Sequence, residues 1–276
     1  MGTAARREPL KQRVNRCLLK LADRDTEAMA AAELEAIARS LGPDELPAFV
    51  SAVSDARPTD KTPLRRHALR ALALVAASHP RDAVAPLVPR ILAAALRRVR
   101  DQDSSVRAAL VDTARAAAAA SASASAALRP LTDALLHEQD QCAQLAAALA
   151  AAAAVEASEP TDDLATYLRA LLPRLLKLLR SAAFKAKPAL ISLIGTASAA
   201  SGGGAASTAV PSLRDALTGD DWAARKAAAE ALALLALEHG DDLISHKSSC
   251  ITVFEAKRFD KVGRIVKVGI LTAVSS

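Results

Sequence analysis

Acidic turns recur along this sequence at intervals close to 40 residues. Asp101, Asp140, Asp220 and Asp260 each follow an apolar stretch, and successive members are 39, 80 and 40 residues apart. The interval of 80 spans two periods. A fixed period of this length in a helix-rich chain is typical of helical hairpins, none of which buries its apolar face alone. The spacing therefore predicts an all-α solenoid in which each hairpin packs on its neighbours.

The segment 219–240 is the clearest single unit of this pattern. Asp220 and Asp221 stand in a turn, where their carboxylates are placed to cap the helix that follows. The helix carries one apolar stripe at spacings of three and four, formed by Ala227, Ala231, Leu234 and Leu235. Gly240 is predicted to end it in a left-handed C-terminal cap. Together with a short apolar helix expected at residues 211–217, this segment reads as one HEAT repeat.

Six to seven such hairpins are expected along the chain. Their predicted ranges are residues 10–40, 45–78, 86 to about 120, 127–155, 164–197 and 211–240, with a shortened seventh that starts at Leu243. The glycine run 202–204 is predicted to be a flexible surface loop. We expect one continuous HEAT-repeat array over residues 8–262, followed by an atypical, truncated tail at residues 263–276.

Composition and charge narrow the class of protein further. The chain is 51% hydrophobic but only 2% aromatic, so its core is expected to consist of alanine and leucine on closely packed helices. A formal charge of +6 favours an acidic partner, and tubulin, nucleic acid and anionic lipid all qualify. The cysteines show no CxxC spacing and are predicted to be isolated, buried thiols of a reducing compartment: Cys17, Cys142 and Cys250.

Membrane, catalytic and nucleic-acid functions find little support in the sequence. Alanine runs such as 146–154 are too short and too weakly apolar to span a bilayer, and a soluble, cytosolic protein is expected. No phosphate-binding GxxxxGK[ST] motif occurs, and the five histidines form no HExxH or other paired ligand spacing. We therefore expect no enzyme activity, cofactor or metal. One tryptophan and one tyrosine provide few platforms for stacking bases, which disfavours nucleic acid as the partner.

Four segments resemble a known family. They are RVNRCLLKLADRDTEAMAAAELEAIARSL at 13–41, RVRDQDSSVRAALVDT at 98–113, DDWAARKAAAEALALLA at 220–236 and EAKRFDKV at 255–262. Together they resemble the TORTIFOLIA/SPIRAL family of plant microtubule-associated proteins, whose amino-terminal region is a TOG-like array of HEAT repeats. The resemblance implies a protein of the cytoplasm and cytoskeleton that binds cortical microtubules, tunes their organisation and so controls directional growth.

The sequence departs from this family in two respects. After Lys261 the family continues as an amphipathic helix that contains Arg and Glu, whereas this chain reads VGRIVKVGILTAVSS. Family members also carry a long basic, serine-rich region and a carboxy-terminal module beyond the array, and neither occurs in this sequence. The first departure bears on whether the last helix forms, and the second on how tightly the chain binds the microtubule lattice.

The resemblance also implies where tubulin binds. In TOG-type arrays the turns within the repeats form one edge that meets tubulin, and short loops on a rigid solenoid present their side chains in a fixed row. The candidates here are Arg24, Lys61, Arg100, Lys185, Lys187, Trp222, Arg225, Lys226, Arg258 and Lys261. The alternatives are that these are ordinary solvated turn residues, or that a protein or peptide binds the concave helical face instead.

Arg107, Asp103, Asp221 and Phe259 are predicted to be structural. Arg107 is expected to bond a turn acid such as Asp103, and Arg225 has an equivalent partner in Asp221. Phe259 is expected in the core. Trp222 is predicted either to be an exposed anchor for a partner or to pack between neighbouring units.

Overall fold

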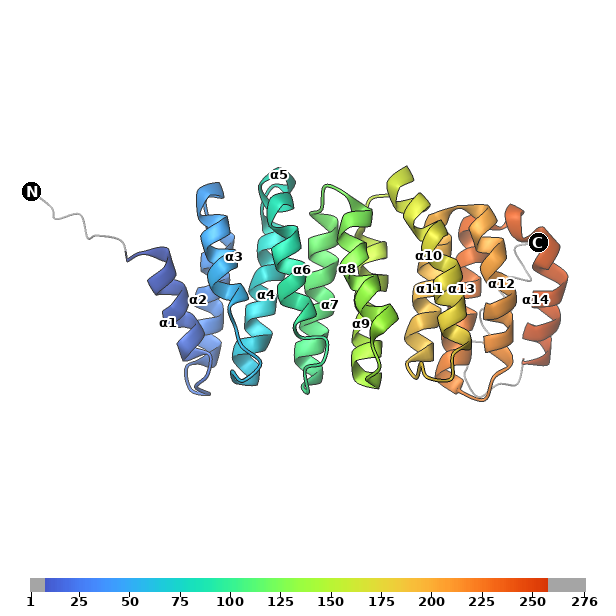
Figure 1. Ribbon diagram of the computed structural model, residues 1–276, viewed down its shortest axis with the longest axis horizontal. Coiled ribbons are helices and arrows are strands. Elements are labelled where there is room, and N and C mark those ends of the chain that lie inside the picture. The colour runs from blue at the N-terminus through green and yellow to red at the C-terminus, as the bar shows by residue number, and fades with distance from the viewer. Residues whose placement is uncertain (1–7, 258–276) are drawn as a thin grey trace, which may run out of the picture. The chain divides into compact units, whose positions relative to one another are not determined.

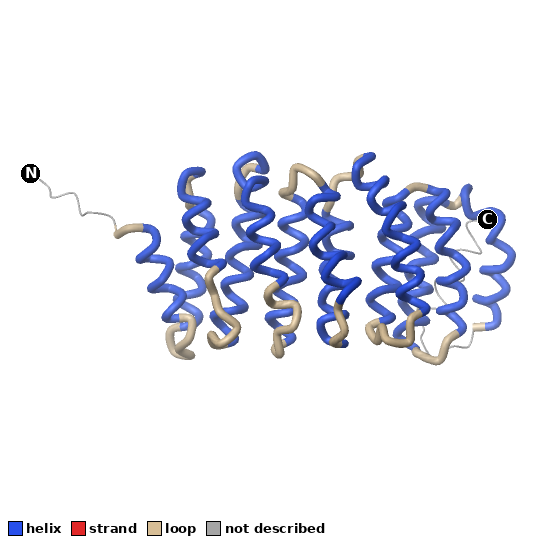
Figure 2. The backbone as a smooth tube through the Cα atoms, in the orientation of Figure 1, coloured by secondary structure: helices blue, strands red, loops and turns tan. Residues whose placement is uncertain are grey.

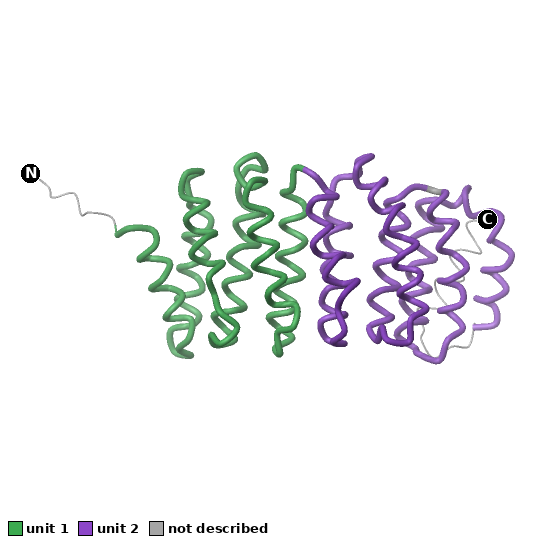
Figure 3. The backbone as a smooth tube through the Cα atoms, in the orientation of Figure 1, with its two compact units in different colours: residues 1–122 green, residues 123–276 purple. Residues whose placement is uncertain are grey.

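The computed structural model describes residues 8–257, and every regular element within them is a helix. The chain divides into two compact units, residues 1–122 and residues 123–276 (Figure 3). Each unit is a stack of helical hairpins, in which two helices are joined by a short turn (Figure 1). The predicted fold class, an all-α HEAT-repeat solenoid, is confirmed.

Unit 1 contains three hairpins. The first pairs α1 (Leu10–Lys20) with α2 (Glu27–Arg39). The second pairs α3 (Leu46–Ser54), which follows the 3₁₀ helix η1 (Pro43–Glu45), with α4 (Thr62–Ser78). In the third, α5 (Arg81–Val84) and η2 (Ala85–Leu87) lead into α6 (Val88–Leu96), which pairs with α7 (Ser104–Ala119). The second helices α2, α4 and α7 pack against one another in sequence order.

Unit 2 repeats this arrangement. Its hairpins are α8 (Ala124–His137) with α9 (Gln141–Ala157), α10 (Asp162–Arg180) with α11 (Lys187–Ser201), and α12 (Gly203–Thr218) with α13 (Trp222–His239). The described part of the chain ends with η3 (Asp241–Leu243) and α14 (Ile244–Ala256). Helices α9, α11 and α13 form the inner row, in which α11 packs against both of the others.

Short polar side chains set the starts of several helices. Asp103, Asp140 and Asp221 are the N-cap residues of α7, α9 and α13, and each carboxylate accepts a hydrogen bond from a backbone N–H in the first turn. Ser123 and Thr161 do the same for α8 and α10. An N-cap of this kind satisfies a donor that the helix itself leaves unpaired. Of the periodic turn acids seen in the sequence, Asp140 is itself a helix cap, while Asp101 and Asp220 lie one or two residues before the caps Asp103 and Asp221.

Hydrogen bonds between successive hairpins repeat the same period. His79, after α4, contacts the carbonyl oxygen of Ala38 at 2.7 Å, and His239, at the end of α13, contacts that of Ala199 at 2.7 Å. The first contact joins residues that are 41 positions apart in the sequence, and the second joins residues that are 40 positions apart. In each, the imidazole satisfies a carbonyl in the last turn of the preceding inner helix, which the helix leaves without an intrahelical donor.

Asp163 joins two hairpins of unit 2 at their outer helices. Its Oδ2 accepts hydrogen bonds from the Ser123 hydroxyl at 3.0 Å and the Ser125 backbone N–H at 3.2 Å. Its Oδ1 accepts one from the Ser125 hydroxyl at 2.8 Å. A carboxylate in the first turn of α10 thus stabilises the amino end of α8, where negative charge is favourable.

The inner helices approach closely because their facing side chains are small. Helix α9 buries nine alanines, and Gly195 of α11 faces Ala231 of α13. A Cβ atom added at Gly195 would lie 2.6 Å from the Cβ of Ala231. This separation is below the contact distance of two carbon atoms, so only glycine fits there.

Two sequence predictions near the glycines are wrong. Gly203 and Gly204 belong to α12, and only Gly202, with φ of 92°, lies outside the helix. Helix α12 starts before Pro211 because Ala206, Ala209 and Val210 are fully buried, and this burial outweighs the backbone hydrogen bond that the proline removes. Gly240 has right-handed φ and ψ of −53° and −43° and leads directly into η3, so it is not a left-handed cap.

The close contact of α11 with α13 generates a stability prediction. Gly195→Ala should lower the free energy of unfolding by about 1–3 kcal/mol, because the added methyl group forces the two helices apart. Urea denaturation followed by circular dichroism measures this loss. Gly204→Ala is the matched control, since no atom lies within 4 Å of its added Cβ and alanine favours the helix. Equal stability of the two variants would contradict the close-contact interpretation.

Candidate functional site

The turns within the hairpins lie at one end of the helices in each unit (Figure 2). In unit 1 they are residues 21–26, 55–61 and 97–103, which we call the turn edge of unit 1. In unit 2 they are residues 138–140, 181–186 and 219–221, the turn edge of unit 2. The proposed tubulin-binding residues that fall within residues 8–257 lie either in these turns or near the starts of the helices that follow them.

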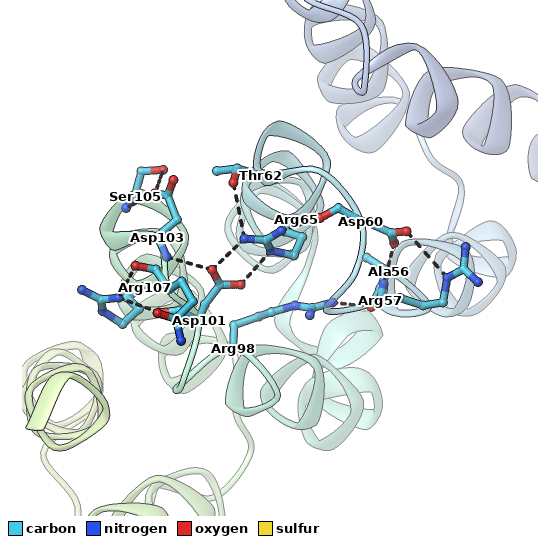
Figure 4. A network of polar contacts seen from close by, with 11 residues as sticks. Ala56, Arg57, Asp60, Thr62, Arg65, Arg98, Asp101, Asp103, Ser105 and Arg107 are labelled. Atoms are coloured by element: carbon cyan, nitrogen blue, oxygen red, sulfur yellow. Dashed lines mark hydrogen bonds and ion pairs between the residues drawn. The ribbon is translucent and has the colours of Figure 1, made fainter. Parts of the chain in front are cut away.

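A buried ion pair joins the second and third turns of unit 1 (Figure 4). The Arg65 guanidinium donates two hydrogen bonds to Asp101, from Nε to Oδ2 at 2.7 Å and from Nη2 to Oδ1 at 2.8 Å. The two side chains are only 12% and 4% exposed. This bidentate geometry is the strongest form of an arginine–carboxylate contact. The hydrogen bonds that Arg65 donates to Asp101 raise the pKa of Arg65, so the arginine stays protonated.

Two arginines of the third turn extend this network to the second. Arg98 is 4% exposed and donates from Nη2 to the carbonyl of Ala56, and Arg97 donates to the carbonyl of Ser54 at 2.5 Å. Burial lowers the pKa of Arg98, and the nearby Asp101 carboxylate opposes that shift. The two turns are therefore held together by side chains of the third turn and by Arg65 of α4, which bond backbone carbonyls in and beside the second turn.

Arg107 and Arg225 have the same place in their hairpins. The Arg107 guanidinium donates to the backbone carbonyls of Asp101 at 2.5 Å and Gln102 at 3.1 Å. Arg225 donates to the carbonyls of Gly219 at 3.1 Å and Asp220 at 2.8 Å. The Asp103 carboxylate, which was expected to pair with Arg107, instead accepts from the N–H and hydroxyl of Ser105. Each arginine thus fixes its turn through the backbone, while the acid caps the helix.

Exposed cations surround this internal network. Arg24, Lys61 and Arg100 lie exposed on the turn edge of unit 1, as the sequence analysis proposed. Two further exposed arginines of the same turns, Arg57 and Arg97, were missed. Their turn position in the 40-residue pattern is the signal that could have identified them. Three carboxylates of these turns are exposed as well, those of Asp23, Asp25 and Asp55, so five exposed cations leave the edge with a modest excess of positive charge.

The turn edge of unit 2 presents fewer cations and one aromatic side chain. Lys185 is exposed, and its Nζ donates to the carbonyl of Ala182 at 2.8 Å, while Lys187 and Lys226 are partly buried. Trp222 is the first residue of α13 and is 61% exposed. Of the two positions considered for this tryptophan, the structure shows the exposed one. Arg258, Phe259 and Lys261 lie outside the described residues.

The remaining chemistry-bearing side chains are dispersed. Within residues 8–257 no group of three or more His, Cys, Asp or Glu side chains is arranged to hold a metal ion. Over the same residues, no helix combines the length and apolarity needed to cross a membrane. Cys17 is buried, and burial raises the pKa of its thiol to about 11. Cys142 is exposed and Cys250 is partly buried, so the expectation of buried thiols holds fully only for Cys17.

The stacked hairpins with turns along one edge define a HEAT-repeat solenoid. Comparison with solved structures indicates the same fold. The chain is similar to Kap121p, with a TM-score of 0.65 at 18% identity, covering 95% of this chain and 28% of that one. It is likewise similar to Kap121p bound to Pho4p, with a TM-score of 0.64 at 18% identity and coverages of 94% and 28%. At these identities the likeness concerns the fold alone.

Sequence comparison identifies the family. A model described as TORTIFOLIA1 N-terminal matches residues 8–275, and the chain belongs to this family. It is 40% identical over 260 residues to TORTIFOLIA1-like protein 5 of Arabidopsis thaliana, covering 92% of this chain and 52% of the relative. It is 35% identical over 272 residues to the microtubule-associated protein TORTIFOLIA1 of the same plant, covering 92% and 31%. The chain spans about half or less of the length of these relatives.

The buried ion pair of unit 1 leads to a second prediction. Asp101→Asn should lower the free energy of unfolding by about 3 kcal/mol, because it leaves the Arg65 guanidinium buried without its counterion. Urea denaturation measures the loss. Arg57→Ala is the control, since its contact with Asp60 is long, at 3.6 Å, and the arginine is 77% exposed. A change below 0.5 kcal/mol in Asp101→Asn, similar to that of the control, would refute a structural role for the pair.

The capping carboxylates predict a defined loss of stability in acid. Hydrogen bonds from the Ser105 hydroxyl and N–H hold the pKa of Asp103 below its ordinary value of 3.8, and those from Ser125 and Ser123 lower the pKa of Asp163. A lowered pKa in the folded state stabilises the protein above the unfolded pKa, and this contribution disappears as the pH falls through the folded pKa.

The variant Asp103→Asn/Asp163→Asn should therefore lose less stability than the wild type between pH 5 and pH 3. Urea midpoints at the two pH values test this expectation. Asp112→Asn, which removes an exposed carboxylate of α7, is the control. If the wild type and the double variant lost the same amount of stability between pH 5 and pH 3, Asp103 and Asp163 would be excluded as the source of that loss.

Proposed function

We propose that this protein binds microtubules through its turn edges and that it is not an enzyme. Its relative TORTIFOLIA1 is named a microtubule-associated protein. The observation that carries the proposal is the charge of the turn edge of unit 1. Its exposed cations outnumber its exposed carboxylates: they are Arg24, Arg57, Lys61, Arg97 and Arg100 against Asp23, Asp25 and Asp55. Because tubulin is acidic, such a surface is electrostatically complementary to it.

Rigidity of the turns supports this proposal. Short loops fixed by hydrogen bonds to their backbone lose little conformational freedom when a partner binds, which favours affinity. In unit 1 the ion pair and the Arg98 and Arg107 contacts supply this restraint, and in unit 2 Arg225 restrains the turn beside Trp222. Trp222 adds a large exposed apolar surface of the kind that often dominates binding energy.

We further propose that the protein acts in the cytoplasm on cortical microtubules, where it regulates their organisation and thereby directional growth. The family membership and the resemblance of the sequence segments support this finer assignment. Within the array, Arg24, Lys61, Arg100, Lys185, Lys187, Trp222 and Lys226 are the proposed tubulin contacts, together with Arg258 and Lys261. Arg225 is assigned to both roles, because it also fixes its turn.

The test uses substitutions on the turn edges that leave intact the hydrogen bonds by which Arg65, Arg98, Arg107 and Arg225 fix the turns. The variant Lys61→Ser/Lys185→Ser/Trp222→Ala should weaken binding to stabilised microtubules by at least tenfold, since it removes two exposed cations and the aromatic anchor. Co-sedimentation across a range of salt concentrations measures the affinity, and wild-type binding should weaken as salt rises.

The matched control removes the same kinds of side chain away from the turns. Lys11→Ser/Lys247→Ser/Leu237→Ala deletes two exposed lysines on α1 and α14 and an exposed apolar side chain of α13. It should bind like the wild type. Equal weakening in both variants would indicate a non-specific charge effect, and no loss in the turn-edge variant would refute the proposed binding surface.

A further inference from the structure

A pocket of about 710 Å³ lies in unit 2 at the opposite end of the inner helices from the turn edge. The carboxyl-terminal ends of α9, α11 and α13 meet the first turns of α10 there, and each contributes residues to the lining. Its volume is within the range of pockets that bind small molecules or several side chains of a peptide. The proposed microtubule surface does not include it.

Carboxylates dominate the charge of this pocket. Glu156 of α9, Asp162 of α10 and Glu238 of α13 line it, and all three are exposed. The described part of the chain supplies no hydrogen bond or ion pair to the carboxylates of Asp162 and Glu238. Three helices also direct their carboxyl ends toward the pocket, and each such end carries a partial negative charge. The pocket is acidic on a chain whose formal charge is +6.

The basic side chains of the pocket are already engaged with the protein. Arg169 donates from Nη1 to the carbonyl of Ser201 at 3.1 Å and from Nη2 to the hydroxyl of Thr166 at 3.1 Å. The Nε2 of His239 donates to the carbonyl of Ala199 at 2.7 Å. These contacts satisfy carbonyls at the end of α11 and hold both basic groups in place. They leave Asp162 and Glu238 as the groups available to a ligand.

Apolar side chains form the rest of the lining. Val155, Leu164 and Leu234 come from three different helices, and Ala199 and Ala200 come from a fourth. A lysine or arginine side chain matches this combination, because its aliphatic stem packs on apolar surface while its charged head stays near carboxylates and water. An anionic or purely apolar ligand would instead desolvate the carboxylates without compensation.

We propose that this pocket binds a peptide segment of a partner protein through an arginine or lysine side chain. The stem of that side chain packs against Leu234 and Ala200, and its charged head pairs with Asp162 and Glu238. The site is separate from the turn edges, so the protein holds a basic peptide and a microtubule by different ends of its inner helices.

A library of random dodecapeptides displayed on phage provides the test. Selection against the immobilised wild-type chain should enrich peptides that contain arginine or lysine. The best of them, synthesised with a fluorescent label, should lose at least tenfold in affinity for Asp162→Asn/Glu238→Gln by fluorescence anisotropy. Replacing its arginine with citrulline, which is uncharged and similar in shape, should cause a comparable loss.

Asp215→Asn/Glu255→Gln is the control, because it removes two exposed carboxylates of unit 2 outside the pocket. It should retain wild-type affinity, and both variants should keep the wild-type unfolding temperature and microtubule binding. The proposal is overturned if selection enriches no basic peptide, if both variants bind the peptide equally, or if the citrulline peptide binds as well as the original.

Discussion

The whole architecture depends on the close approach of neighbouring inner helices. Alanine covers α9 on nearly every face, and Gly195 faces Ala231 with no room for another carbon atom. Small side chains bury little apolar area each, so stability comes from bringing many backbone atoms within contact distance. The low aromatic content of the chain follows from this arrangement, because a large ring between such helices would separate them.

Polar contacts complement this packing at both ends of the helices. At the turn ends, Arg65 and Asp101 join successive hairpins, and arginines fix the turns from within. At the opposite ends, histidines satisfy the last carbonyls of the preceding inner helix. The charges that hold the fold are thus paired internally, whereas Lys61 of the turn edge and Asp162 and Glu238 of the pocket are exposed to solvent.

The sequence was sufficient for the fold because acids stand in the turns of most hairpins, at or just before the start of the second helix. Asp140 caps α9, and Asp101 and Asp220 lie one or two residues before the caps of α7 and α13, so the period of these acids revealed the hairpins. The start of α12 was missed because the burial of Ala206 and Ala209 overrides the glycines and Pro211, and burial against a neighbouring hairpin is a tertiary effect. The sequence also could not predict the pairing of Arg65 with Asp101 or the acidic pocket. Both depend on the register in which hairpins stack, which no local pattern encodes.

The hydrogen bonds between hairpins have a consequence for how the chain reaches its fold. The contacts from Arg65 to Asp101 and from Thr113 to the carbonyl of Leu69 join residues 36 and 44 apart, which is about one repeat. Loops of this length cost little entropy to close, and each new hairpin needs only its predecessor as a template. Folding within each unit therefore starts at any hairpin and spreads along the stack, so a growing chain on the ribosome acquires its structure one repeat at a time.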